Sequence, residues 1–268
     1  MLQRCSLWVG GLAAILAPFL AGCGKQATST FGTVGASISV APTPPAPPTA
    51  PKVKIDLLNT KPDFTMSAED YFDDLDKRKA QAEEKYRGKV IQLRGEVLTL
   101  DRGPGGVGQV GLIGGKAPGK QVICYTQFPE PWKAVFPGQQ IEVRGTLPES
   151  LFSPALADAI FVAFGEIPGT KITAAELAKA YAADANAALK KYRNHYLIVE
   201  GEIAAKDADG KVTLKGFGKV KVDCSFNPSL FPPGIFVVGK TIKAHGKHDA
   251  FAADEGSVSL QFCQLVPK

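Results

Sequence analysis

The chain has 268 residues, of which 45% are hydrophobic and 21% charged, and its formal net charge is only +5. A balance this close to neutral argues against a protein that binds nucleic acid through a strongly basic surface. The length is sufficient for two domains of about 100 residues, each able to bury a modest core of its own.

The N-terminus has the pattern of a bacterial export signal that ends in a lipid-attachment site. Arg4 precedes an apolar run at residues 7–20, too short to span a bilayer, and the run ends in Leu20-Ala21-Gly22-Cys23. A basic start, a short apolar core and small residues before the cut are typical of signal peptides. The final cysteine makes the segment resemble a lipobox. We therefore expect residues 1–22 to be a signal peptide and Cys23 to carry lipid.

The lipobox resemblance implies a protein of the cell envelope, held on a membrane by its acyl chains. Stable anchoring needs two or more chains, which a processed lipoprotein carries. Gly24 follows the cysteine, where an acidic residue would resemble an inner-membrane retention signal. In a bacterium with two membranes we therefore expect the outer membrane, with the protein facing the periplasm. The alternative is a plain signal peptide that contains a cysteine.

Residues 23–60 have the composition of a tether. Residues 26–39 are mostly Ser, Thr, Gly and Ala, and residues 41–51 read APTPPAPPTAP. Proline-rich sequence favours the extended polyproline II conformation, and a segment this polar cannot bury enough apolar surface to fold. We expect a passive spacer with a reach on the order of 100 Å, rather than a proline motif that docks to a partner.

The rest of the chain is an internal duplication. Residues 85–97 read KYRGKVIQLRGEV and residues 191–203 read KYRNHYLIVEGEI, at an offset of 106. Further matches follow in the same order, and pair Val122, Cys124, Gly138, Ile141 and Gly145 with Val222, Cys224, Gly239, Ile242 and Gly246. A repeat this long indicates two tandem domains rather than a solenoid of short units. We place them at residues 61–165 and 166–268.

Each domain is predicted to begin with a helix. Ser67-x-x-Asp70 and Thr173-x-x-Glu176 fit the capping-box pattern, in which side chains satisfy the free N–H groups of the first turn. Apolar residues then recur on one helical face of each copy. They are Ala68, Tyr71, Phe72, Leu75, Ala82 and Tyr86 in the first copy, and Leu177, Ala178, Tyr181, Ala185, Ala188 and Tyr192 in the second.

Five strands are predicted after each helix. We expect them at residues 90–100, 107–113, 121–125, 140–146 and 159–164, and at residues 196–204, 211–215, 219–224, 241–244 and 258–265. Turn sequences rich in Gly, Pro and Asp separate them. Five short strands of alternating character indicate a small closed barrel, because closure removes exposed sheet edges.

The order of these motifs resembles the tRNA_anti-like family of OB-fold domains. A helix ending in Lys-Tyr-x-Gly-Lys, a Val/Ile-x-Gly-x-Val strand, a Val-x-Cys strand and a Gly-x-x-Ile-x-Val-x-Gly segment carry the resemblance, over residues 67–265. The second copy fits better, with Asn186 and Cys263, where the first copy has Ala80 and Val162. The resemblance implies a mainly β, α+β fold: two tandem OB-like five-stranded barrels, each preceded by an α-helix. It brings no catalytic residues.

No motif predicts an enzyme. His245-x-x-His248-Asp249 could offer ligands to a metal, but the stretch resembles a strand running into a turn, and we expect exposed loop residues there. Residues 103–106 lack the Lys-Ser/Thr end of a phosphate-binding loop, and no Ser or Cys lies in a nucleophile elbow. We therefore expect no cofactor, no metal and no catalytic activity.

One hairpin is a candidate binding site: Lys211, Lys215, Lys219 and Lys221 surround Phe217. OB barrels can bind single strands by stacking bases on aromatic residues beside basic ones. The two domains have net charges of only −1 and +3, however, so we expect an ordinary solvated face. The leading hypothesis is an anchored lipoprotein that binds an envelope protein or an oligosaccharide. The alternative is binding of nucleic acid or another anionic polymer through the second domain.

The cysteines give the last prediction. The export signal places them in an oxidising compartment, where disulfides persist. The third and fifth strands of an OB barrel are neighbours, so Cys224 and Cys263 are expected to form a disulfide. Cys124 is expected to be a buried free thiol, because Val162 is aligned where its partner would stand.

Overall fold

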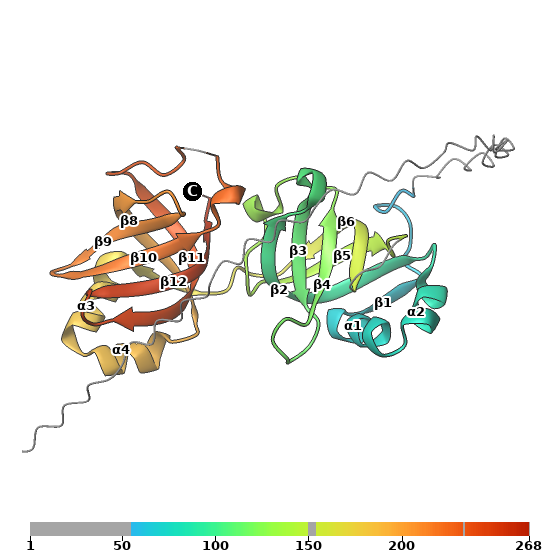
Figure 1. Ribbon diagram of the computed structural model, residues 1–268, viewed down its shortest axis with the longest axis horizontal. Helices are drawn as coiled ribbons and strands as arrows, with labels where there is room; N and C mark the ends of the chain where they lie inside the picture. Colours follow the sequence, from blue (N-terminus) through green and yellow to red (C-terminus); the bar gives the residue numbers. More distant parts are fainter. Residues whose placement is uncertain (1–54, 150–153, 233, 268) are drawn as a thin grey trace, which may run out of the picture. The chain divides into compact units, whose positions relative to one another are not determined.

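The computed structural model in Figure 1 describes residues 55–149, 154–232 and 234–267. The signal peptide, the lipid site at Cys23 and nearly all of the tether lie outside the described residues. The described chain is mainly β with α, and forms two barrels of the same design, as the sequence predicts. No helix in this part is long and apolar enough to cross a membrane.

In its described residues, the first barrel contains six strands, two α-helices and two short 3-10 helices. The order is β1 (Phe64–Ser67), α1 (Ala68–Lys77), α2 (Lys79–Tyr86), β2 (Val90–Arg102), η1 (Pro104–Gly106), β3 (Gly108–Ile113), β4 (Gln121–Thr126), η2 (Pro131–Lys133), β5 (Gln140–Thr146) and β6 (Ala155–Phe164). The sheet order is β1-β2-β3-β4-β6-β5, and β2 also pairs with β5. That last pairing closes a barrel of five strands, with β1 added outside it.

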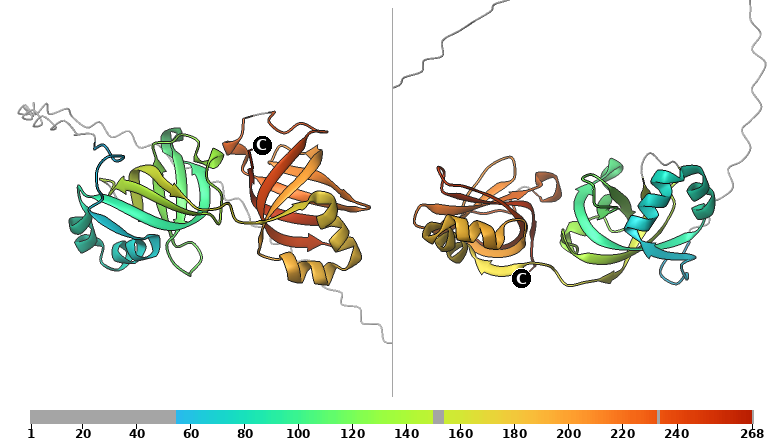
Figure 2. Two further views of the ribbon diagram at one scale, coloured as in Figure 1. Left: turned by 180° about the vertical axis from the view of Figure 1, so that it is seen from behind. Right: turned by 90° about the horizontal axis from the view of Figure 1, so that it is seen from below.

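The second barrel repeats this order. Its elements are β7 (Thr170–Thr173), α3 (Ala174–Ala183), α4 (Ala185–Tyr192), β8 (Tyr196–Lys206), β9 (Lys211–Phe217), β10 (Val220–Phe226), η3 (Pro228–Leu230), β11 (Thr241–Ala252) and β12 (Ser257–Leu265). The pairing of β11 with β8 closes it. Figure 2 shows the helices of each barrel grouped on one side of its strands.

Each predicted helix is two helices. Ser67 caps α1 by accepting a hydrogen bond from the Asp70 amide, and Thr173 and Glu176 form a full capping box at α3. The break falls at Arg78 in the first copy and at Asp184 in the second, positions that the offset of 106 relates. Asp184 caps α4 by accepting from the Ala187 amide at 3.0 Å, which favours a new helix start there.

The glycine of the repeated strand motif is required by helix packing. A Cβ on Gly95 would lie 2.9 Å from the Cβ of Ala68, and a Cβ on Gly201 would lie 2.8 Å from that of Ala174. Both alanines are the first residue of their helix. The bare glycine therefore lets the start of α1 or α3 lie directly on the barrel strand.

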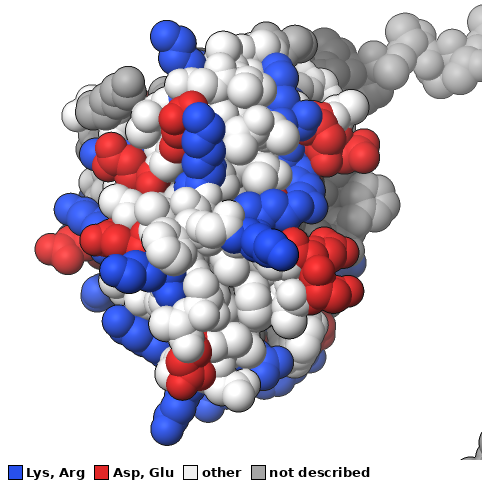
Figure 3. All heavy atoms as spheres, turned by 90° about the vertical axis from the view of Figure 1, so that its left-hand side faces the viewer, with Lys and Arg blue, Asp and Glu red and all other residues white. Residues whose placement is uncertain are grey.

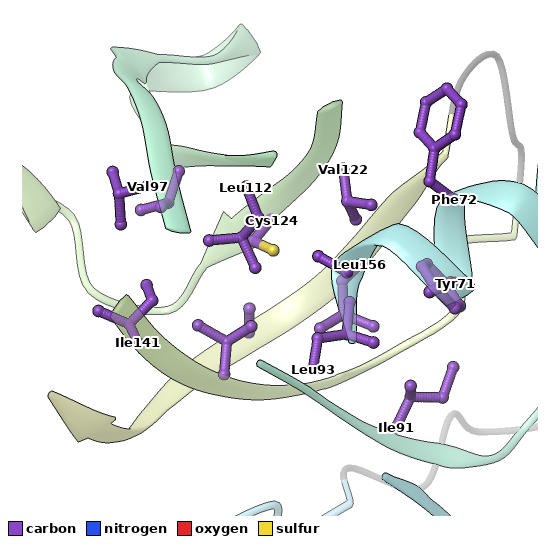
Figure 4. Packing of buried hydrophobic residues seen from close by; sticks show 14 of the residues in the cluster. Tyr71, Phe72, Ile91, Leu93, Val97, Leu112, Val122, Cys124, Ile141 and Leu156 are labelled. Atoms are coloured by element: carbon purple, nitrogen blue, oxygen red, sulfur yellow. The ribbon is translucent and has the colours of Figure 1, made fainter. Parts of the chain in front are cut away.

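Each barrel has its own apolar core. Figure 4 shows that of the first barrel, where Leu112, Val122, Cys124 and Leu156 are all fully buried. The hydroxyl of Tyr71 donates a hydrogen bond to the Ala155 carbonyl at 2.9 Å, and so ties α1 to β6.

The pairing of the last strands corrects the alignment of the two copies. Thr126 pairs with Ala159, and the corresponding Phe226 pairs with Cys263. Ala159, not Val162, therefore stands at the position of Cys263. Ala159 is buried like Cys263, whereas Val162 is exposed. The sequence alignment was wrong here because it carried the offset of 101 into the last strand, whereas the second copy is three residues longer before that strand and the offset there is 104.

Candidate functional site

Most of the positive charge of the hairpin at residues 211–221 is neutralised by neighbouring carboxylates. Lys211 and Lys221 lie 2.9 and 3.9 Å from Asp223, and Lys215 pairs with Glu202. For Lys219 no ion pair is found among the described residues. Phe217 is 50% exposed. The hairpin therefore does not form a uniformly basic surface. Basic and acidic side chains also lie next to one another on the face shown in Figure 3.

Asp223 organises this hairpin from a buried position. Its carboxylate accepts hydrogen bonds of 2.6 Å from Thr213 Oγ1 and from Ser257 Oγ. Burial acts to raise the pKa of Asp223, but the hydrogen bonds from Ser257, Thr213 and Lys211 outweigh it and hold that pKa below its ordinary value. The carboxylate of Asp223 thus links β10 to β9 and β12 by hydrogen bonds. It also forms the ion pairs with Lys211 and Lys221.

The two histidines are buried strand residues, and the expectation of an exposed loop is wrong. The pairing of β11 with β8 ends at Lys247, and β11 continues to Ala252 because it pairs with β12 across two irregularities in register. The Nε2 atom of His245 lies 2.9 Å from the Pro168 carbonyl oxygen, and burial lowers the pKa of His245 to about 4. The Nε2 atom of His248 lies 2.7 Å from the Tyr181 hydroxyl, and burial lowers its pKa as well.

The histidines thus have structural partners, and their rings do not converge on a shared site with Asp249. Within the described ranges, no group of three or more His, Cys, Asp or Glu side chains could hold a metal ion. The chemistry of these residues is hydrogen bonding inside the second barrel.

Cys224 and Cys263 lie on the neighbouring parallel strands β10 and β12, as expected for the third and fifth barrel strands. Both are buried free thiols in the structure, so the predicted disulfide stays a prediction. Burial raises the pKa of the Cys263 thiol, and a hydrogen bond with Cys224 adds to this effect. Cys124 is also a buried free thiol, as predicted, and burial raises its pKa to about 12.

A groove on the first barrel is a site that the sequence analysis missed. We call it the phenylalanine groove; it has a volume of about 380 Å³ and is lined by Gln127, Phe128, Ala134, Ile160, Phe161 and Phe164. None of these described lining residues is charged. The ring centroids of Phe128 and Phe161 are 6.4 Å apart, and those of Phe161 and Phe164 are 5.4 Å apart.

The phenylalanine groove leaves large aromatic surface in water. Phe128 is 43% exposed and Phe164 is 52% exposed, and the neighbouring Val162 on β6 is exposed too. Clusters of exposed apolar side chains on soluble domains commonly mark interaction sites, whereas single exposed apolar residues carry no such meaning.

The second copy shows that the barrel does not need these rings. From the strand pairings, Pro228 corresponds to Phe128 and Leu265 to Phe161. Leu265 packs against the core of the second barrel, and Phe161 packs in the same way against the core of the first. The second barrel closes with the same strand order without an aromatic cluster there. The exposed rings of Phe128 and Phe164, unlike that of Phe161, are not among the residues that pack against the first core.

One sequence signal could have revealed the groove. Residues 160–164 read IFVAF, a continuous apolar run, where an exposed strand would alternate apolar and polar residues. The sequence analysis predicted only a strand at residues 159–164 from this run. The register of the strand pairs shows that this run lies beyond Ala159, the last residue of β6 that pairs with β4.

The sequence matches no protein-family model and no curated protein. Among solved structures, a Klebsiella pneumoniae protein described provisionally as a nucleic acid-binding lipoprotein aligns over 37% of this chain and 91% of its own, with 18% identity and a TM-score of 0.31. A murine DNA-binding protein bound to double-stranded DNA aligns over 66% and 97%, with 11% identity and a TM-score of 0.21. A deletion mutant of the single-stranded DNA-binding protein of Thermus aquaticus aligns over 67% and 94%, with 13% identity and a TM-score of 0.20. Similarities this low carry no argument about the ligand of this chain.

Proposed function

We propose that this chain is a non-enzymatic lipoprotein of the cell envelope, which binds a partner protein through the phenylalanine groove of its first barrel. The lipobox-like end of the signal peptide, at Cys23, supports the anchor and the location. The resemblance to tRNA_anti-like OB domains is part of the same proposal, and OB barrels serve widely as binding modules.

The observation that carries the proposal is the cluster of Phe128, Phe161 and Phe164, in which the rings of Phe128 and Phe164 are exposed. The described residues at the corresponding positions of the second copy, Pro228 and Leu265, are not aromatic. Exposed aromatic surface is the kind that protein interfaces bury, because aromatic rings provide large contact area at low entropic cost. The groove favours a protein over an oligosaccharide. Gln127 is the one polar side chain among its described lining residues, whereas sugar hydroxyls require several hydrogen-bonding groups.

Binding of nucleic acid through the second barrel is the less supported alternative. Affinity of that kind comes mainly from Lys and Arg on phosphates. Three of the four hairpin lysines are already opposite carboxylates, and Asp223 and Glu202 would repel a polyanion.

Affinity capture from the native membranes tests the proposal. Lipidated wild type, Phe164→Ala and Phe217→Ala are compared, and bound proteins are identified by mass spectrometry. Both substituted rings are about half exposed, so both variants should fold. We expect a partner that wild type and Phe217→Ala retain and Phe164→Ala loses. A set of bound proteins that is the same for all three chains would contradict the proposal.

A further inference from the structure

We propose that the occupant of the phenylalanine groove is an extended, uncharged peptide segment of a partner protein, which adds as a strand to the free edge of β6. This inference rests on the proposed function and specifies the kind of partner. It combines two features of the same place, a strand edge and an aromatic groove.

The strand edge results from unequal pairing on the two sides of β6. On one side, β4 pairs with β6 only as far as Ala159, where the Gln127 amide donates to the Ala159 carbonyl at 2.9 Å. On the other side, β5 pairs with β6 as far as Phe164. Between Ile160 and Phe164, no described residue pairs with the β4-facing edge of β6.

The aromatic groove lies along this edge. Ile160, Phe161 and Phe164 line it from β6, and Phe128 and Ala134 line it from the chain that has left β4. An incoming strand would gain backbone hydrogen bonds from the edge, and its alternate side chains would point into the groove. A strand edge recognises a peptide backbone, which neither a sugar nor a lipid provides.

The lack of charged side chains among the described lining residues of the groove indicates the composition of the segment that binds there. A charged group of the ligand would be desolvated in the groove without a partner. The segment that fits is therefore uncharged over its central residues, with β-branched or aromatic side chains at alternate positions.

Among its described residues, the second barrel has no strand edge of this length. β12 ends at Leu265, two residues after Cys263, whereas β6 continues for five residues beyond the corresponding Ala159. Pro267 follows soon after, and proline has no N–H to offer a neighbouring strand. Only the first copy combines the longer last strand with the aromatic side chains.

Selection from a displayed library of random decapeptides on the full-length lipidated chain tests the inference. We expect enriched peptides that are uncharged at their centre and apolar at alternate positions. One synthetic enriched peptide is then measured by fluorescence anisotropy, together with versions N-methylated on alternate amides. Methylation on the edge-facing amides should weaken binding about tenfold or more, and methylation on the other amides much less.

The protein variants separate the possible outcomes. Phe164→Ala should weaken peptide binding about tenfold, and Phe217→Ala should leave it unchanged. No enrichment, charged or helix-patterned peptides, or indifference to N-methylation would overturn the inference. A wild-type dimer that Phe164→Ala dissociates would also overturn it, because the occupant would be a second copy of this chain. The proposed function fails separately, when capture of the partner from membranes does not depend on Phe164.

Discussion

Two residues at matching positions, Arg144 and His245, perform the same task with different chemistry. Arg144 Nη1 donates to the carbonyls of Leu57 and Thr60, both at 2.9 Å, and His245 bonds the Pro168 carbonyl at the same distance. Each side chain thus holds the segment that enters its own barrel. Arginine stays charged at any physiological pH, whereas a buried histidine must be neutral. The two entry segments should therefore respond differently to acid.

The pKa of His245 predicts a loss of stability in acid. It is lowered from 6.5 to about 4 in the folded chain, so the unfolded chain binds a proton first as the pH falls. The stabilising contribution is complete above pH 6.5 and is lost as the pH falls toward 4, with a slope of about 1.4 kcal/mol per pH unit for one proton.

Urea unfolding between these two pH values measures the effect, with His245→Gln as the comparison. The variant keeps an N–H donor for Pro168 and cannot titrate. We expect it to be less stable than wild type at neutral pH and to lose stability more slowly in acid. The pH dependence left in the variant comes from His248 and, near pH 4, from carboxyl groups such as Asp223 and Glu176, whose pKa values are also lowered. Equal slopes for the two proteins would disprove the assignment.

At the scale of elements, Gly201 of β8 lets the start of α3 lie directly on that strand. Gly201→Ala should destabilise the second barrel by about 1 to 3 kcal/mol, because the new methyl would lie 2.8 Å from the Cβ of Ala174. Adding Ala174→Gly should restore part of the loss by removing that methyl. Thermal unfolding of the single and double variants checks this. If the stability lost in the double variant equals the sum of the losses in the two single variants, the contact between residues 174 and 201 is unimportant.

The strands β10 and β12 should be joined by a disulfide when the protein is exported. Cys224 and Cys263 contact each other in the barrel interior, and a bridge over this long loop would stabilise by about 3 to 4 kcal/mol, less any strain. Non-reducing peptide mapping of protein purified from the envelope should find the Cys224–Cys263 pair and a free Cys124. Three free thiols in that protein would refute the bridge.

Elements with local signals could be predicted from the sequence, and those that depend on distant pairing could not. The capping residues Ser67 and Thr173 marked both helix starts, and apolar patterns bounded by turn sequences marked the ten barrel strands. β1 and β7 were missed because four residues are too few for a period to show. β11 was predicted too short, since it is the pairing with β12 that extends it to Ala252. The phenylalanine groove was missed because it also depends on distant pairing. It lies where β6 continues beyond the end of its pairing with β4.

At the scale of the whole molecule, the proposed function combines a lipid anchor at Cys23 with a binding surface on the first barrel. Replacing Cys23 with Ser should release the protein from membranes or stop its processing, because the thiol that accepts the lipid is gone. Cell fractionation and the mass of the mature protein measure this. Unchanged membrane association together with an unchanged mass would exclude lipid attachment at Cys23.

The charge balance of the whole chain predicts poor binding of nucleic acid. At physiological salt we expect weak, non-specific affinity on the order of 10⁻⁴ to 10⁻⁶ M, because most hairpin lysines are paired with carboxylates. Fluorescence anisotropy of the purified chain with single-stranded RNA and DNA tests this at two salt concentrations. Submicromolar binding that survives physiological salt and falls on Phe217→Ala would favour the alternative function.

The central claim is that the phenylalanine groove contacts a partner protein on the membrane, and photocrosslinking in living cells tests it most directly. A photoreactive phenylalanine analogue is placed at Phe164 in one strain and at Phe217 in another, since both side chains are about half exposed. We predict a discrete crosslinked protein from position 164 and none of that mass from position 217. Crosslinks absent at 164, or equally strong at both positions, would contradict the account.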